Sequence, residues 1–213
     1  MRWKNFIWII LLLLGSNTVI AQNKDFGVWT GIKVSKKWKK KWSTAVEVQT
    51  RFNQNASHLR SVYFQGGANY KFAKWYKLGA SYRFTNFEEI SSAHRVDLDN
   101  EFKYKLKDHT FELRLKYQKT LVTNDLKGNR FRIRIKYIYK INKKLKPYVK
   151  AQYFYTQAYD FKGWHQQRYS IGALIRLRKR NYLDVFYNYD FEYNVKRPDQ
   201  RFVLGVKYKF ELK

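Results

Sequence analysis

The chain has 213 residues, enough for one domain or a small pair of domains. Its 44 Lys and Arg residues outnumber 16 Asp and Glu residues, which gives a formal net charge of +28, and none of its residues is Cys. The lack of Cys excludes a disulfide-stapled mini-domain, a Cys-ligated metal site and a thiol nucleophile. An apolar content of 45% excludes a disordered polycation, and an aromatic content of 19% argues against a nucleic-acid partner.

The first 21 residues have the pattern of a signal peptide. Arg2 and Lys4 precede the apolar run Phe6–Leu14, and residues that are small or aliphatic occupy the −3 and −1 positions before a cut after Ala21. We therefore expect export and a mature chain of residues 22–213. The alternative, a membrane anchor, needs roughly 20 apolar residues, about twice the length of this run.

Alternation of apolar and polar side chains with period two predicts eleven candidate strands and no helix. In chain order, the apolar faces are Phe26–Val34, which is the weakest, Trp42–Phe52, Val62–Phe72, Tyr76–Phe84, Val96–Leu106, Phe111–Tyr117, Phe131–Tyr139, Val149–Tyr155, Tyr169–Leu177, Leu183–Tyr189 and Phe202–Phe210. Many faces carry aromatic residues at both ends. Ten residues in a tilted strand span about 26 Å, which matches the apolar band and two aromatic girdles of an outer-membrane barrel. A soluble β-sandwich with core aromatics is the alternative.

Short basic connections alternate with longer ones, as in an up-and-down antiparallel barrel. The short connections are Lys36–Lys41, Ala73–Trp75, Lys107–His109, Ile141–Lys146 and Lys179–Asn181, and the longer ones are Asn53–Leu59, Asn86–His94, Thr120–Asn129, Gln157–Gln167 and Phe191–Gln200. We expect the short turns to face the periplasm and the longer loops the exterior. Bacterial single-chain barrels usually have an even number of strands. The all-β transmembrane barrel should therefore have ten strands, with Phe26–Val34 outside the wall, or twelve, with one strand unrecognised.

The last candidate strand contains a glycine followed by two aromatic residues two positions apart, Gly205, Tyr208 and Phe210. This pattern resembles the C-terminal signal that the outer-membrane assembly machinery reads, so that machinery is an expected partner. Outer-membrane lipid and lipopolysaccharide are also expected partners.

Four segments resemble a known family. They are Gln22–Thr30, Lys41–Phe52, the strand end Tyr82–Phe84 and the C-terminal strand. The chain is similar along its mature length to the uncharacterised outer-membrane β-barrel family known as domain of unknown function 2490, common in Bacteroidetes-type Gram-negative bacteria. The resemblance implies an outer-membrane barrel and no established activity, so it assigns no functional residue.

Five arginines recur at intervals of 33 to 38 residues, each directly after a longer connection: Arg60, Arg95, Arg130, Arg168 and Arg201. Parity directs the last four into the lumen, and Arg60 to the other face unless a bulge intervenes. Such an outer rim would attract anions. Alternatively, these arginines bind lipopolysaccharide phosphates or the loop carboxylates Glu88, Asp125, Asp160 and Asp199.

Six basic side chains of three consecutive strands form a second lumen feature, a basic wall of Arg114, Lys116, Arg130, Arg132, Arg134 and Lys136. We expect Asp97, Asp99 and Glu101 to pair with Arg114 and Lys116. Like charges directly opposite one another destabilise a sheet, so this wall should be hydrated or hold an anion.

Enzyme signatures are sparse. His94 near Ser91, Ser92, Asp97 and Asp99 is the one hydrolase-like cluster, and we interpret it as an ordinary loop rim. We predict no catalytic residue, no metal site and no cofactor. The leading interpretation is a small porin-like channel or binding barrel for anionic solutes. The alternative is a structural or accessory barrel with a plugged lumen that contacts envelope proteins or lipopolysaccharide.

Overall fold

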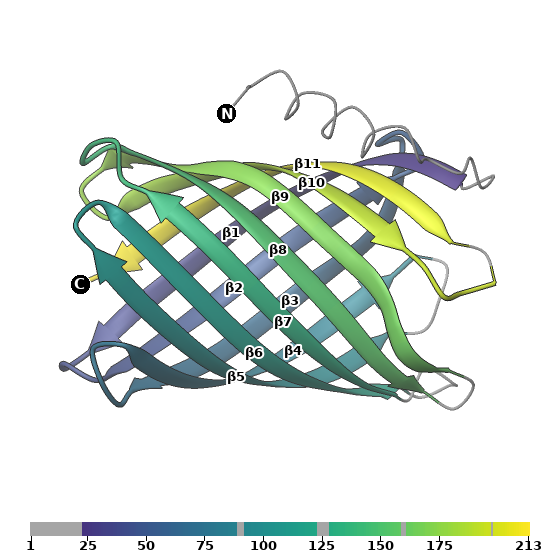
Figure 1. The fold of residues 1–213 in the computed structure, drawn as a ribbon, viewed down its shortest axis with the longest axis horizontal. Helices are drawn as coiled ribbons and strands as arrows, with labels where there is room; N and C mark the ends of the chain where they lie inside the picture. The colour runs from purple at the N-terminus through teal and green to yellow at the C-terminus, as the bar shows by residue number, and fades with distance from the viewer. Residues whose placement is uncertain (1–22, 89–91, 123–127, 159–160, 197) are drawn as a thin grey trace, which may run out of the picture.

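The computed structural model describes residues 23–88, 92–122, 128–158, 161–196 and 198–213, which form one closed barrel of eleven strands (Figure 1). The strands are β1 (Asn23–Trp38), β2 (Trp42–Asn53), β3 (His58–Lys71), β4 (Tyr76–Phe87), β5 (Ala93–Leu106), β6 (His109–Val122), β7 (Gly128–Tyr139), β8 (Leu145–Ala158), β9 (Lys162–Arg178), β10 (Asn181–Glu192) and β11 (Asp199–Leu212). The predicted all-β barrel is confirmed. The predicted signal peptide and its cleavage site lie outside the described residues.

The barrel closes through a parallel pair, β1 with β11, which runs from Asn23 opposite Asp199 to Lys36 opposite Leu212. All other neighbouring strands pair antiparallel in chain order. Phe26–Val34 is therefore part of a complete wall strand. The strand count lies within the predicted range, but the expectation of an even number is wrong. An even number is required only where the first and last strands close antiparallel.

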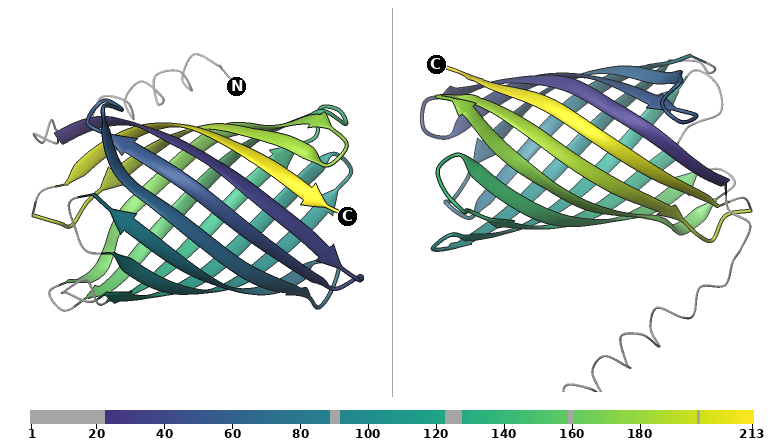
Figure 2. Two further views of the ribbon diagram at one scale, coloured as in Figure 1. Left: turned by 180° about the vertical axis from the view of Figure 1, so that it is seen from behind. Right: turned by 90° about the horizontal axis from the view of Figure 1, so that it is seen from above.

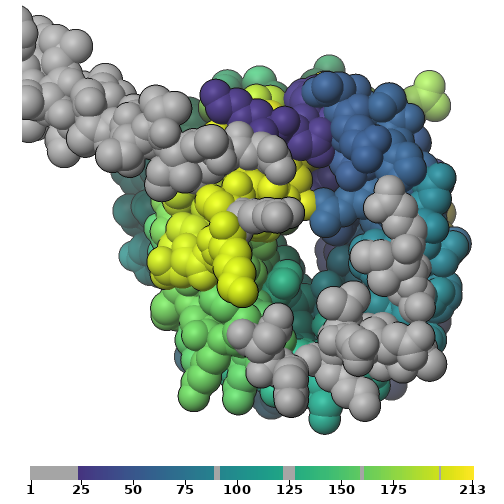
Figure 3. Space-filling view, turned by 90° about the vertical axis from the view of Figure 1, so that its right-hand side faces the viewer, coloured from purple at the N-terminus to yellow at the C-terminus, as the bar shows by residue number. Residues whose placement is uncertain are grey.

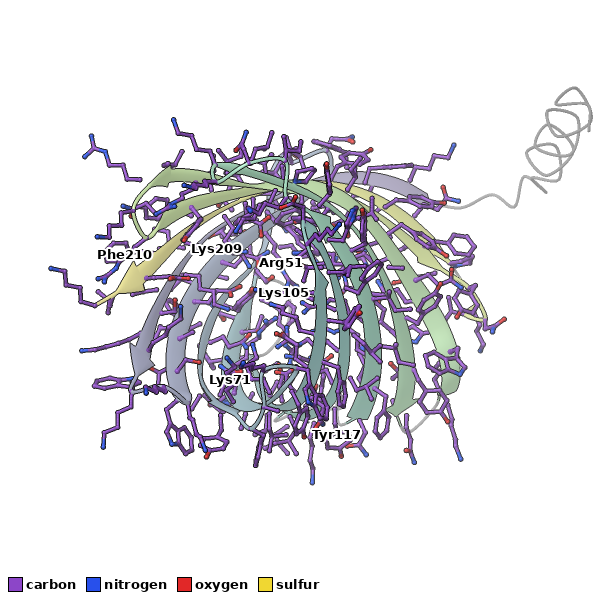
Figure 4. All side chains as sticks on the ribbon, turned by 60° about the vertical axis from the view of Figure 1, so that its left-hand side comes forward. Arg51, Lys71, Lys105, Tyr117, Lys209 and Phe210 are labelled. Carbon is purple, nitrogen blue, oxygen red and sulfur yellow. The ribbon has the colours of Figure 1, made fainter. Side chains whose placement is uncertain are left out.

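Each strand presents an apolar face outward and a polar face inward, the reverse of a soluble sandwich. Ile32, Val46 and Ile171 are exposed on the outside, whereas Asp97 and Asn188 inside are at most 1% exposed. Figure 4 shows side chains on both faces of the wall, with Phe210 outside it at the end of β11. Period-two alternation thus sorts the side chains as the sequence predicts. In the described part of the chain, no helix is long and apolar enough to cross a bilayer.

Two aromatic side chains of the lumen face lie over glycines of neighbouring strands. Tyr148 stands opposite Gly172, and Phe186 stands opposite both Gly172 and Gly205. A Cβ atom on Gly172 would lie 2.7 Å from the Tyr148 ring, and one on Gly205 would overlap the Phe186 ring. Glycine at these positions gives the rings room to lie flat against the inner wall.

The two ends of the barrel differ. The short turns and the end of β11 lie at one end, on the left in Figure 1, and the longer connections and the start of β1 lie at the other. The two further views in Figure 2 show the same separation of the start of β1 from the C-terminus. We call these the turn end and the loop end.

Candidate anion-binding lumen

A cavity of about 780 Å³ occupies the lumen near the loop end. Asp190 is its one acidic lining residue among those described, and lysine is absent from the same lining. The basic lining residues are seven arginines: Arg51, Arg60, Arg83, Arg95, Arg130, Arg168 and Arg201. Figure 3 faces this end and shows an opening between the blue side of β2 and β3 and the yellow side of β10 and β11. We call this cavity the arginine vestibule.

All five rim arginines of the sequence analysis line the arginine vestibule. Arg60 reaches it although strand parity points it outward. The reason is a β-bulge between β2 and β3, where Arg51 pairs with Ser61 and the next residue, Phe52, pairs with Leu59. The bulge leaves Arg60 without a partner position in the ladder and changes the direction of its side chain.

Three of the rim arginines bind carboxylates that belong to strands. Arg95 Nε lies 2.8 Å from Asp97, and Arg168 Nε lies 2.5 Å from Asp190. Arg201 Nη2 lies 3.2 Å from Glu192. The proposed loop partners differ from these: Asp125 and Asp160 lie outside the described residues, and Glu88 meets Arg60 through its backbone N–H.

The basic wall is largely neutralised on β6. Lys116 Nζ lies 2.8 Å from Asp97 and 3.1 Å from Asp99, and Arg114 Nε lies 2.6 Å from Asp99. These three contacts confirm the expected pairing of Asp97 and Asp99 with Arg114 and Lys116. Glu101 instead contacts Lys77, which stands directly opposite it on β4, at 2.9 Å. Arg114 stands directly opposite it on β6 but binds Asp99.

The four wall residues of β7 differ in their partners. Arg134 lies 3.5 Å from Glu101 and 3.9 Å from Glu112. Lys136 lies 3.7 Å from the centre of the Tyr148 ring. Among the described residues, no carboxylate lies within ion-pair distance of Arg130, Arg132 or Lys136. Excess positive charge is therefore concentrated on part of the predicted wall.

A chain of alternating guanidinium groups and aromatic rings runs along the inner wall from β4 through β3, β2 and β1, and then across to β9, β8 and β7. We call it the arginine–aromatic belt. Each distance joins an arginine guanidinium carbon to the centre of a ring. The Tyr63 ring lies 3.7 Å from Arg83 and 5.0 Å from Arg51, and the Trp29 ring lies 4.5 Å from Arg51 and 4.8 Å from Arg168. The Phe154 ring lies 5.5 Å from Arg168, 5.9 Å from Arg130 and 5.7 Å from Arg132. Cation–π contact stabilises clustered arginines that lack carboxylate partners.

Arg51, Arg83 and the rings on which they stack were not among the residues predicted from the sequence. A signal was present, because Trp29, Tyr63 and Phe154 occupy lumen positions by parity, where polar residues are usual. Figure 4 labels Arg51, which projects into the interior of the barrel. An aromatic residue at a lumen position of a barrel strand therefore indicates a specific contact inside the barrel, here a stacked arginine.

The remaining predicted features are separate from the vestibule. His94 Nδ1 lies 2.5 Å from the Tyr82 hydroxyl on the outer face, whereas Asp97 points inward, so the described members of the hydrolase-like cluster do not assemble. Ser91 lies outside the described residues.

In the C-terminal pattern, the Tyr208 hydroxyl donates to Asn181 Oδ1 at 2.6 Å, and Gly205 accommodates the Phe186 ring. The described residues contain no group of His, Asp and Glu suited to hold a metal ion.

Comparisons with known proteins agree with this fold. The family described as "Protein of unknown function (DUF2490)" matches residues 26–210. A bacterial polysaccharide outer membrane secretin superposes with a TM-score of 0.54 and 11% identity over 83% of this chain and 67% of that one. The beta domain of the Bordetella autotransporter BrkA superposes with a TM-score of 0.52 and 13% identity over 79% and 82%. Identities this low establish the barrel fold alone. No curated protein matches the chain in sequence.

Proposed function

Because the chain belongs to the DUF2490 family and folds as a barrel of the outer-membrane type, we propose that it forms a passage for anionic solutes in a Gram-negative outer membrane. The observation that carries this proposal is the arginine vestibule, whose lining holds seven arginines, of which three are paired with strand carboxylates. Fixed positive charge at the mouth of a lumen attracts anions and repels cations.

The shape of the lumen supports a passage. The opening in Figure 3 continues clear through the molecule along that view. The exposed apolar outer face would contact lipid and lipopolysaccharide, and Tyr208 and Phe210 would serve the assembly machinery from the turn end. The longer loops, and with them the arginine vestibule, would face the exterior.

Planar-bilayer recording tests the proposal. The purified barrel, with folding verified by heat-modifiable gel migration, is inserted under a KCl gradient and its reversal potential is measured. We expect discrete conductance with a reversal potential displaced toward that of chloride. A folded and inserted barrel that conducts without preference, or with cation preference, would contradict the proposal.

A second candidate function has its own structural support. Tyr148, Phe154 and Phe186 are at most 9% exposed on the lumen side, and the Asp97–Lys116–Asp99 network lies beside the same lumen. Side chains that narrow the lumen suit an accessory barrel, which would act by contacting envelope proteins or lipopolysaccharide. Absence of conductance in the folded barrel would favour this function.

A further inference from the structure

Three hydrogen-bonding groups of the lumen face lie together on β2 and β3 with donors that lack a protein partner. Gln49 Nε2, Arg51 Nε and Ser61 Oγ are buried, and none of them hydrogen-bonds to a described residue. Arg51 stands directly opposite Ser61 in the β2–β3 ladder, and Gln49 is two residues before Arg51 on the same face. We call these three residues the β2–β3 donor patch.

The surroundings of the donor patch fix which atoms remain free. The Gln49 carboxamide oxygen lies 2.5 Å from the Tyr63 hydroxyl, so its amide nitrogen is directed away from that contact. Gly31 of β1 stands opposite Gln49, so that strand places no side chain over the patch at this level. Gln49 and Ser61 are 3% and 2% exposed, which makes unmatched donors costly there.

Two aromatic rings lie close to the Arg51 guanidinium group. One ring, Trp29, lies 4.5 Å from its guanidinium carbon, and another, Tyr63, lies 5.0 Å away. Stacking uses the faces of a guanidinium group, and its five N–H donors lie in the plane at the edge. No described carboxylate lies within ion-pair distance of Arg51, and Arg51 lines the arginine vestibule.

We propose that the β2–β3 donor patch binds an oxyanion group, such as a phosphate or phosphomonoester, with Arg51 as its principal ligand. Three donors of different kinds on two adjacent strands suit an anion with several acceptor oxygens. A planar guanidinium fork matches two such oxygens and does not match a spherical halide. Arg83, whose Nε donates to Gln65 at 2.9 Å while its guanidinium stacks on Tyr63, adds positive charge beside the patch.

The inference rests on the proposed anion-binding lumen but is tested by equilibrium binding rather than by transport. Isothermal titration calorimetry of the full barrel in detergent and chloride buffer would use sodium phosphate, glycerol phosphate and further sodium chloride as separate titrants. We expect saturable binding of at least one phosphate titrant near one site per barrel and none of chloride. Stronger binding of glycerol phosphate would identify a phosphomonoester ligand, and stronger binding of inorganic phosphate a free ion. A barrel that binds phosphate without conducting supports the inference while contradicting the passage.

Matched variants locate the site. Arg51→Lys keeps the charge and loses the fork, so we expect binding at least about tenfold weaker. Arg178→Lys, at an exposed arginine of the turn end that does not line the vestibule, should change it less than about threefold. Ser61→Ala removes one small hydroxyl and serves if Arg51→Lys fails to fold; it should also weaken binding. No phosphate binding by the native barrel, or equal weakening in Arg51→Lys and Arg178→Lys, would overturn the inference.

Discussion

Asp97 is the most completely buried charge in the barrel, and its removal should be among the most damaging single changes. Its side chain is 0% exposed and accepts hydrogen bonds from Arg95 at 2.8 and 3.2 Å, from Lys116 at 2.8 Å and from Gln118 at 3.1 Å. Asp97→Asn would leave two cations short of a partner inside the lumen. Breaking a buried ion pair from one side costs about 3–5 kcal/mol.

The expected loss of stability in Asp97→Asn lies at the lower end of that range. Lys116, only 4% exposed, keeps Asp99 at 3.1 Å after the substitution, and Arg95 borders the vestibule, where solvent can reach it. We therefore expect Asp97→Asn to lower the free energy of unfolding by about 3 kcal/mol.

The assay is equilibrium unfolding in urea from lipid vesicles, followed by tryptophan fluorescence. Asp108→Asn is the matched control, because Asp108 pairs with Lys140 at 3.2 Å with both side chains about half exposed. Exposed pairs contribute about 0–1 kcal/mol, so the control should change little. If Asp97→Asn proves no more destabilising than Asp108→Asn, the assignment of Asp97 as the anchor of the network is wrong.

Two further predictions concern the lumen wall. Gly205→Val places a side chain against the Phe186 ring, and we expect about 1–3 kcal/mol of destabilisation in thermal unfolding; a variant as stable as the native barrel would show that the ring has room to move. If the barrel conducts, neutralising Arg132, Arg134 and Lys136 together should lower its anion selectivity. Arg132→Gln alone should act more strongly than Arg134→Gln, because Arg134 already lies near Glu101 and Glu112. The reversal potential under a salt gradient measures both, and unchanged selectivity in the triple variant would contradict the role of the wall.

Period-two alternation was sufficient to place almost every side chain on the correct face, because the outer face of the barrel wall is apolar and the lumen face is polar. The parallel closure of the barrel could not be predicted from this alternation. Whether β1 joins β11 in parallel depends on pairing between residues about 175 positions apart, as between Ser35 Oγ and the Phe210 carbonyl, which no local pattern records.

The partners of individual charges were only partly predictable. Neighbouring strands could be assumed to pair, which explains the expected contacts of Lys116 with Asp97 and Asp99. Lys77 and Arg114 both stand directly opposite Glu101, and Glu101 contacts Lys77 while Arg114 binds Asp99. The position of Arg60 depends on a bulge at Arg60 itself. Register and bulges are set by the whole ladder and so required the structure.

Parallel closure has a consequence for how the protein enters a membrane. In a barrel that closes antiparallel, both chain ends stay on the side from which assembly begins, and only hairpin loops need to cross. Here β1 and β11 both start at the loop end. With the loop end facing the exterior, as proposed, the N-terminal end of β1 would itself have to cross the bilayer before the seam forms. In that orientation, insertion would include the translocation of a chain end, and a bulky folded group attached before β1 should arrest assembly where the same group after β11 would not.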